Sequence, residues 1–86
     1  MKLKSEFITY SANGEALLVP TGAASFAGLV KGNRTLEAIL ELLKQDTDEA
    51  SVIAAMLERF DAPEEVIAAD VKKAVSELRA IGALDE

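Results

Sequence analysis

The sequence contains neither histidine nor cysteine among its 86 residues. Without cysteine there is no disulfide and no thiolate nucleophile, and without histidine the commonest metal ligand and the commonest general base near neutral pH are missing. Zinc sites and Ser-His-Asp or Cys-His catalysis are therefore excluded. A catalytic site would have to be built from carboxylates, lysines and Tyr10, and these residues form no recognisable catalytic pattern. We therefore expect a small binding module that is not an enzyme and needs no metal or cofactor.

Long apolar runs and an excess of positive charge are also missing. No stretch approaches the roughly 18 consecutive apolar residues of a membrane span, and the first residues lead into a strand pattern instead of the apolar core of a signal peptide. Fifteen acidic residues against nine basic ones give a net charge of −6, which disfavours phosphate backbones and anionic lipid surfaces and favours basic peptides. We expect a cytoplasmic protein with no membrane and no nucleic-acid partner.

Half of the residues are hydrophobic, which is enough for one independently folding domain over residues 1–86. The hydrophobic period changes once, near Gly32 and Asn33: alternation of period two precedes this point and helical spacing follows it. This order predicts an α+β fold, in which a three-stranded antiparallel sheet is followed by three helices in a winged-helix-like arrangement.

The dipeptide Asn13-Gly14 is the strongest turn signal in the chain, because both residues tolerate the positive φ angles of a type I′ turn. It predicts a hairpin that joins a strand over Phe7–Ala12 to a strand over Glu15–Pro20. A third, short strand is predicted over Ala27–Lys31, at an edge of the sheet.

The two-residue loop also fixes which residues of the hairpin lie opposite each other. Tyr10 lies opposite Leu17, and Ile8 opposite Val19, so four large apolar side chains share one face of the sheet. We expect this face to be the core side of the sheet.

Three helices are predicted after the strands, and each begins at a residue suited to that place. Asn33 and Asp48 can cap the first two, the first of which runs to about Lys44, and Pro63 opens the third. Gly82 supplies a left-handed stop for this third helix, which is the longest at about 19 residues. Apolar residues at helical spacing mark the buried stripes: Leu36, Ile39, Leu40 and Leu43; then Ile53, Met56, Leu57 and Phe60; then Ile67, Val71, Ala74, Val75, Leu78 and Ile81.

The third predicted strand presents an open edge. The segment Phe26–Lys31 is short, apolar and contains glycine, so its unpaired backbone groups can pair with another extended chain. Natural proteins usually protect such an edge, and here only Lys31 does so. Beside it, one flank of the third helix starts apolar and continues with mixed charges at helical spacing, in Val66, Asp70, Lys73 and Glu77. This flank fits the wall of a peptide groove, and it equally fits a solvated surface with one incidental valine.

Five segments carry a resemblance to a known family: Gly28–Asn33, Leu40–Leu43, Met56–Asp61, Ala69–Val71 and Leu78–Leu84. In order and pattern, the run from residue 7 to residue 86 resembles the PqqD family, which is named for a small protein of pyrroloquinoline-quinone biosynthesis and is also known as the RiPP precursor peptide recognition element. The stretch of small residues at 21–25 is less typical and leaves the start of the third strand open.

The resemblance implies three antiparallel strands and three helices, similar to a winged helix, that bind the leader segment of a ribosomally made precursor peptide. In such domains the leader adds as a further strand to the third strand and rests against the third helix, so that a partner enzyme, often a radical SAM protein, can modify the core segment. Carried over to this sequence, the peptide edge falls on Ala27, Gly28, Leu29, Val30 and Lys31, and the opposing wall on Val66, Asp70, Lys73 and Glu77.

Two other interpretations stay open. The order of the helices also allows a winged-helix DNA-binding or regulatory domain, whose third helix would contact a major groove through Lys72, Lys73 and Arg79. Against this, Asp70 and Glu77 share that helix and the chain is acidic. An exposed β edge can also pair with its own copy, which leaves a homodimer through the sheet edge open.

Overall fold

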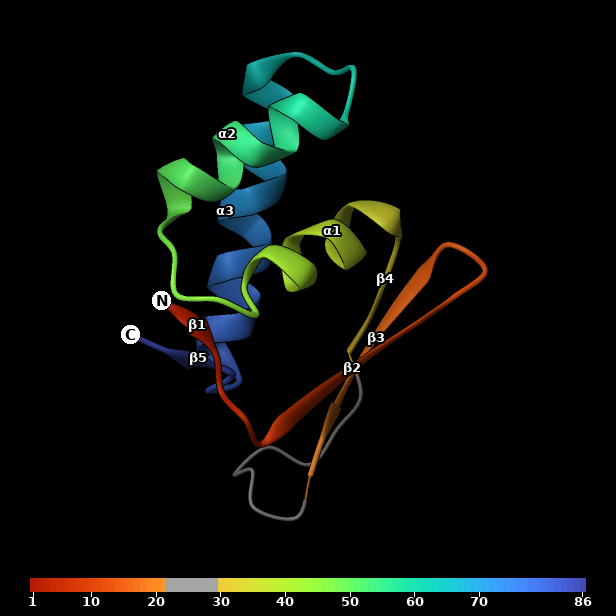
Figure 1. The fold of residues 1–86 in the computed structure, drawn as a ribbon, viewed down its shortest axis with the longest axis vertical. Coiled ribbons are helices and arrows are strands. Elements are labelled where there is room, and N and C mark those ends of the chain that lie inside the picture. Colours follow the sequence, from red (N-terminus) through yellow and green to blue (C-terminus); the bar gives the residue numbers. More distant parts are fainter. Residues whose placement is uncertain (22–29) are drawn as a thin grey trace.

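The computed structural model describes residues 1–21 and 30–86. Three antiparallel strands form one sheet in the order β2-β3-β4, and β1 and β5 form a separate pair. In Figure 1 the helices lie to one side of the larger sheet, with α1 next to it. The predicted α+β fold is confirmed. Its elements are β1 (Lys2–Leu3), β2 (Phe7–Ala12), β3 (Glu15–Pro20), β4 (Val30–Gly32), α1 (Arg34–Leu42), α2 (Glu49–Arg59), α3 (Glu64–Ala80) and β5 (Leu84–Asp85).

The hairpin of β2 and β3 has the predicted turn and register. Asn13 and Gly14 have φ angles of 54° and 78°, and two positive values are the mark of a type I′ turn. Ile8 pairs with Val19, and Tyr10 with Leu17. The third strand begins in the described residues at Val30, so Ala27, Gly28 and Leu29 of the prediction lie outside them.

The prediction of which hairpin face meets the core is wrong. Ile8 and Tyr10 are 44% and 55% exposed, whereas Phe7, Ala16 and Leu18 on the opposite face are buried. The core therefore lies on the face with fewer large side chains.

Small residues at the crossing of the first helix explain this reversal. Ala16 lies opposite Gly32 in the sheet, where α1 packs on β3 and β4. A Cβ atom at Gly32 would lie 2.7 Å from the Cβ of Leu36 in α1, far closer than two carbons in contact. Only the face with this small pair lets the helix approach the sheet, so the four larger side chains are turned outward.

The helix ends follow the sequence closely. Asn33 and Asp48 accept hydrogen bonds from the backbone N–H groups of Leu36 and Ser51, at 3.2 and 2.7 Å. The bond from Ser51 lowers the pKa of Asp48, because it stabilises the carboxylate. Gly82, with φ at 73°, lies in the predicted stop after α3. No helix within the described residues is both long and apolar enough to cross a bilayer.

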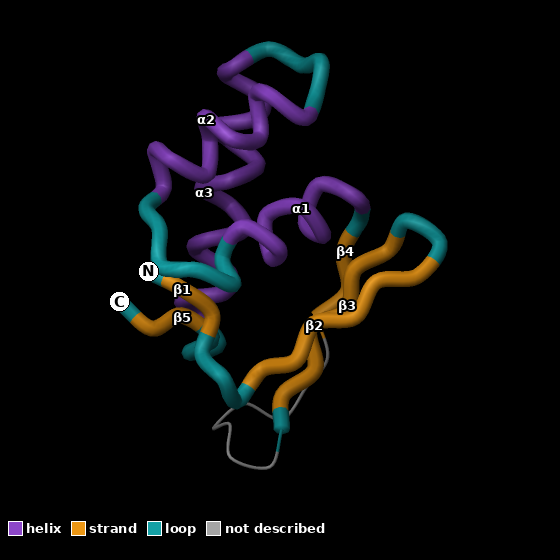
Figure 2. The backbone as a smooth tube through the Cα atoms, in the orientation of Figure 1, coloured by secondary structure: helices purple, strands orange, loops and turns teal. Residues whose placement is uncertain are grey.

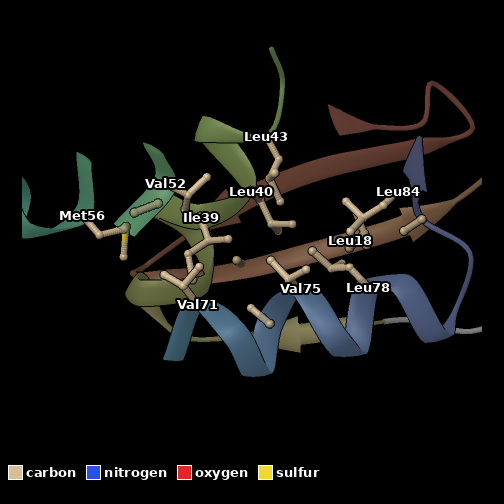
Figure 3. Close-up of a cluster of buried hydrophobic side chains, with 14 of the residues drawn as sticks. Leu18, Ile39, Leu40, Leu43, Val52, Met56, Val71, Val75, Leu78 and Leu84 are labelled. Atoms are coloured by element: carbon tan, nitrogen blue, oxygen red, sulfur yellow. The ribbon is translucent and has the colours of Figure 1, made fainter. Parts of the chain in front are cut away.

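The predicted stripes of the first and third helices are buried except at Leu36 and Ile81, which are half-buried. The buried stripe of α2 is rotated from the predicted one. Val52 and Met56 are buried there, while Ile53, Leu57 and Phe60 are only half-buried. Helix α2 packs chiefly against α3, and this contact buries the side of α2 that carries Val52 and Met56. Figure 3 shows the resulting core, in which side chains of α1 and α3 point toward one another beside β3 and β5; those labelled include Leu18, Ile39, Leu40, Val71, Val75, Leu78 and Leu84.

The short pair of β1 and β5 has no counterpart in the prediction. Lys2 pairs with Asp85 and Leu3 with Leu84, and the N–H of Leu3 donates to the carbonyl of Leu43 at 2.8 Å. The two ends of the domain therefore lie side by side, as Figure 2 shows. Strands of two residues have no periodic pattern, so sequence reasoning had no signal for them.

Candidate functional site

A hollow of about 360 Å³ lies between the open edge of β4 and helix α3. Residues of β4, of the start of α1 and of α3 line it. The lining combines one strand, one capped helix start and three charged positions of α3; it consists of Lys31, Gly32, Asn33, Thr35, Leu36, Ile39, Asp70, Lys73, Ala74 and Glu77.

A smaller apolar hollow of about 200 Å³ continues from the first along α3. The two hollows share Leu36, Ala74 and Glu77, and the smaller one adds Leu78 and Ile81. Together they form a groove, which we call the β4–α3 groove, with a polar part near β4 and an apolar part near the end of α3. Such a surface can hold an extended segment that carries an apolar side chain.

The open edge of β4 presents the backbone of Lys31. In the hairpin, Thr21 donates its N–H to the carbonyl of Glu6 at 2.7 Å, so odd-numbered residues of β3 bond to β2. Backbone groups alternate sides along a strand, and Ala16 and Leu18 therefore bond to β4. Lys31 lies between their two partners, and its N–H and C=O point away from the sheet.

Charges of both signs line the polar part of the groove. Asp70, Lys73 and Glu77 follow one another at helical spacing on α3, and Lys31 lies across from them on β4. Within the described residues none of these four forms an ion pair; the ion pairs there are those of the N-terminus with Asp46, Arg59 with Glu41, and Arg79 with Glu86. The four charged groups are therefore available to a bound segment.

Most of the predicted wall lies in this groove. The structure brings Asp70, Lys73 and Glu77 together with Lys31 in its lining. Val66 does not line it and is 49% exposed in the first turn of α3. Ala27, Gly28 and Leu29 lie outside the described residues, and Val30 belongs to β4.

Sequence reasoning missed the contribution of α1 to the groove. Leu36 belongs to the predicted buried stripe of the first helix, yet it is only half-buried and lines both hollows. Ile81 was likewise predicted as a core residue and is half-buried, whereas Leu78 is buried as predicted and also borders the smaller hollow. The signal was ambiguous, because an apolar residue at helical spacing reads the same whether it lines the core or a groove next to it.

Comparison with solved structures shows a shared fold. The structure matches one described as TbiB1 in complex with the TbiA(beta) leader peptide, with a TM-score of 0.79 and 13% sequence identity. The match covers 99% of this chain and 95% of the other. No curated protein matches this sequence significantly.

Comparison with protein families gives a direct assignment. The model of the family described as Coenzyme PQQ synthesis protein D (PqqD) matches residues 17–84. This range includes β4, all three helices and every described residue of the β4–α3 groove. The family resemblance inferred from the sequence is thus confirmed, and the protein belongs to the PqqD family.

Proposed function

We propose that this domain is a noncatalytic adaptor that captures the leader segment of a ribosomally synthesised precursor peptide and presents it to a modifying enzyme. The leader adds as a strand to the edge of β4 and lies in the β4–α3 groove. The observation that carries this proposal is the free backbone of Lys31 beside a groove that has both an apolar and a charged part.

Strand addition accounts for the chemistry of the groove. The N–H and C=O of Lys31 pair with the backbone of the leader, which provides affinity whatever the leader sequence is. Alternate side chains of the leader then point toward α3, where Leu36, Leu78 and Ile81 accept an apolar group and Asp70 and Lys73 accept polar ones. By the family resemblance, Ala27, Gly28, Leu29 and Val30 extend the same peptide edge, and Val66 extends the wall.

The comparisons support this proposal. The structurally similar TbiB1 was solved with a leader peptide, and the family takes its name from a biosynthetic protein. The expected partner is a modifying enzyme, as in the family, where it is often a radical SAM protein. The adaptor itself supplies no catalytic group in this mechanism.

The test is an amide NMR titration of the labelled domain with candidate leader peptides encoded beside its gene. We expect shifts at Lys31, Gly32 and Asn33 and along residues 70–78. Lys31→Pro removes an outward N–H at an edge position that tolerates proline, and we expect it to weaken binding at least tenfold.

Thr9→Pro is the matched control, because it places the same substitution on the opposite edge of the same sheet. It should leave leader binding unchanged. Leader binding of wild-type strength in Lys31→Pro, with the fold intact by circular dichroism, would contradict strand addition at β4.

The DNA-binding alternative gains no support from the described residues. Arg79 is held by Glu86 through two hydrogen bonds of 2.9 and 2.7 Å, and Lys73 lies in the groove between Asp70 and Glu77. All three cations of this helix are exposed, but only Lys72 is neither paired with a carboxylate nor flanked by two of them, and one such cation is too little for a phosphate-binding surface.

A further inference from the structure

The sheet has a second open edge, on β2. The alternation that frees Lys31 also determines which groups of β2 point outward: Ile8 and Tyr10 bond to β3, whereas Thr9 and Ser11 direct their N–H and C=O away from it. No backbone hydrogen bond in the described part of the chain uses these outward groups of Thr9 and Ser11. A free edge of this kind is a template for another extended chain.

Two hollows flank this edge; carboxylates outnumber lysines in one, and lysines outnumber carboxylates in the other. One, of about 310 Å³, is lined by Thr9 and Ser11 together with Glu37 and Glu41 of α1. Helix α1 packs chiefly on β3 and β4, and on the inner side of β2 Phe7 is buried whereas Thr9 is half-buried and Ser11 is exposed. Glu41 also forms a 3.3 Å ion pair with an exposed arginine, whereas Glu37 has no ion pair in the described residues.

The other hollow, of about 380 Å³, lies at the start of β2 and is cationic. Lys2, Lys4 and Lys44 line it, with Asp85 as its one carboxylate. Both hollows include Thr9 and Lys44, so they adjoin each other along the edge. In a chain with six more acidic than basic residues, a gathering of three lysines is a distinct feature of this edge.

The outer side of the same strand is apolar. Exposed large hydrophobic residues among the described ones are Ile8, Tyr10 and Val66, so two of these three lie on β2. A strand added to β2 would place its own outward side chains next to Ile8 and Tyr10. Exposed apolar groups beside an open edge are typical of an interaction surface.

We propose that the β2 edge is a second strand-addition site, which binds an extended segment of a partner protein antiparallel to β2. The segment has the pattern basic, apolar, any, apolar, acidic. Its basic residue lies opposite Ser11, near Glu37, and its acidic residue lies opposite Phe7, near Lys4 and the other two lysines. Its two apolar residues lie beside Tyr10 and Ile8. This site goes beyond the proposed function, because the leader occupies the other edge of the sheet.

The probe is a capped nine-residue peptide, Gly-Ser-Lys-Val-Thr-Ile-Glu-Ser-Gly, titrated into the labelled full chain. We expect amide shifts at Ile8, Thr9, Tyr10 and Ser11, without shifts at Lys31 and along α3. The control peptide exchanges the lysine and glutamate, and we expect it to bind at least tenfold more weakly. The absence of shifts along β2 at millimolar peptide, or equal or tighter binding of the control, would overturn the proposal.

Thr9→Pro and Glu37→Lys test separately what the backbone and the charges contribute to binding at β2. Thr9→Pro removes an outward N–H and should weaken binding of the probe peptide at least tenfold, whereas Lys31→Pro should leave this binding unchanged. Glu37→Lys alters a half-buried α1 side chain that lines the hollow and is not one of the buried core residues, so it tests the site even if the proline variant fails to fold. We expect it to reduce the preference for the probe over the control peptide severalfold, and an unaltered preference would contradict the assigned orientation.

Discussion

The two open edges of the sheet are alike in backbone and different in surroundings. Both present outward N–H and C=O groups from a strand that pairs with β3 on its other side. At β4 the neighbour is α3, which offers interleaved charges and an apolar hollow. At β2 the neighbour is α1, and charges of opposite sign are separated along the strand. The backbone therefore makes both edges receptive, while the adjacent helix determines which segment each one selects.

The largest effect on stability and on binding is expected from a substitution in β3, the strand that pairs with both edge strands. Leu18 is completely buried on the inner face of β3, between the two edge strands. Leu18→Ala leaves a cavity there and should lower the free energy of unfolding by about 2–5 kcal/mol, measured by urea denaturation. Because β3 supports both strands, binding at the two edges should weaken together, and a selective loss at one edge would show that the edges are supported separately.

A substitution at Gly32 should affect binding at the two edges to different extents. Its Cβ would collide with Leu36, so Gly32→Val has to displace α1 from β4 and should cost about 1–3 kcal/mol of stability. We expect leader binding to fall more than binding of the probe peptide at β2.

A glycine in the hairpin provides the control for this change. Gly14 has a φ angle of 78°, and Gly14→Ala should cost about 1 kcal/mol through backbone strain alone, without moving α1. If both variants weaken leader binding equally, general destabilisation and not groove geometry explains the loss.

The smallest effect on stability is expected from a substitution on the outer face of the hairpin. Ile8 is nearly half exposed and lies outside the buried core, so Ile8→Ser should change the free energy of unfolding by only about 0.5 kcal/mol. It should still weaken binding of the probe peptide at β2 and leave leader binding unchanged. A loss of several kcal/mol would restore the original expectation that this face belongs to the core.

Local signals in the sequence were sufficient for the hairpin and the three helices, but not for the short pair of β1 and β5 or for the packing of the elements. The turn at Asn13 and Gly14, the caps at Asn33 and Asp48 and the order of strands and helices are all as predicted, because each depends on residues close in sequence. The choice of sheet face was wrong, because it depends on a helix approaching one small residue pair from elsewhere in the chain.

The β4–α3 groove was predictable from the sequence only in the part that lies on a single helix. Asp70, Lys73 and Glu77 share one helix face, so their common position followed from helical spacing. The contribution of Leu36 did not follow, because it depends on how α1 lies relative to α3. The β2 edge was missed for a related reason: its flanking charges come from α1 and from the start of the chain.

The position of β3 in the middle of the sheet has a thermodynamic consequence. It is hydrogen-bonded on both sides, so a change in β3 caused by a strand added at one edge would also act on the other edge. Linkage then requires reciprocity: if occupancy of β4 alters the affinity of β2 by some factor, occupancy of β2 alters the affinity of β4 by the same factor. A sheet whose two open edges flank one shared strand can in this sense couple the binding of two extended ligands.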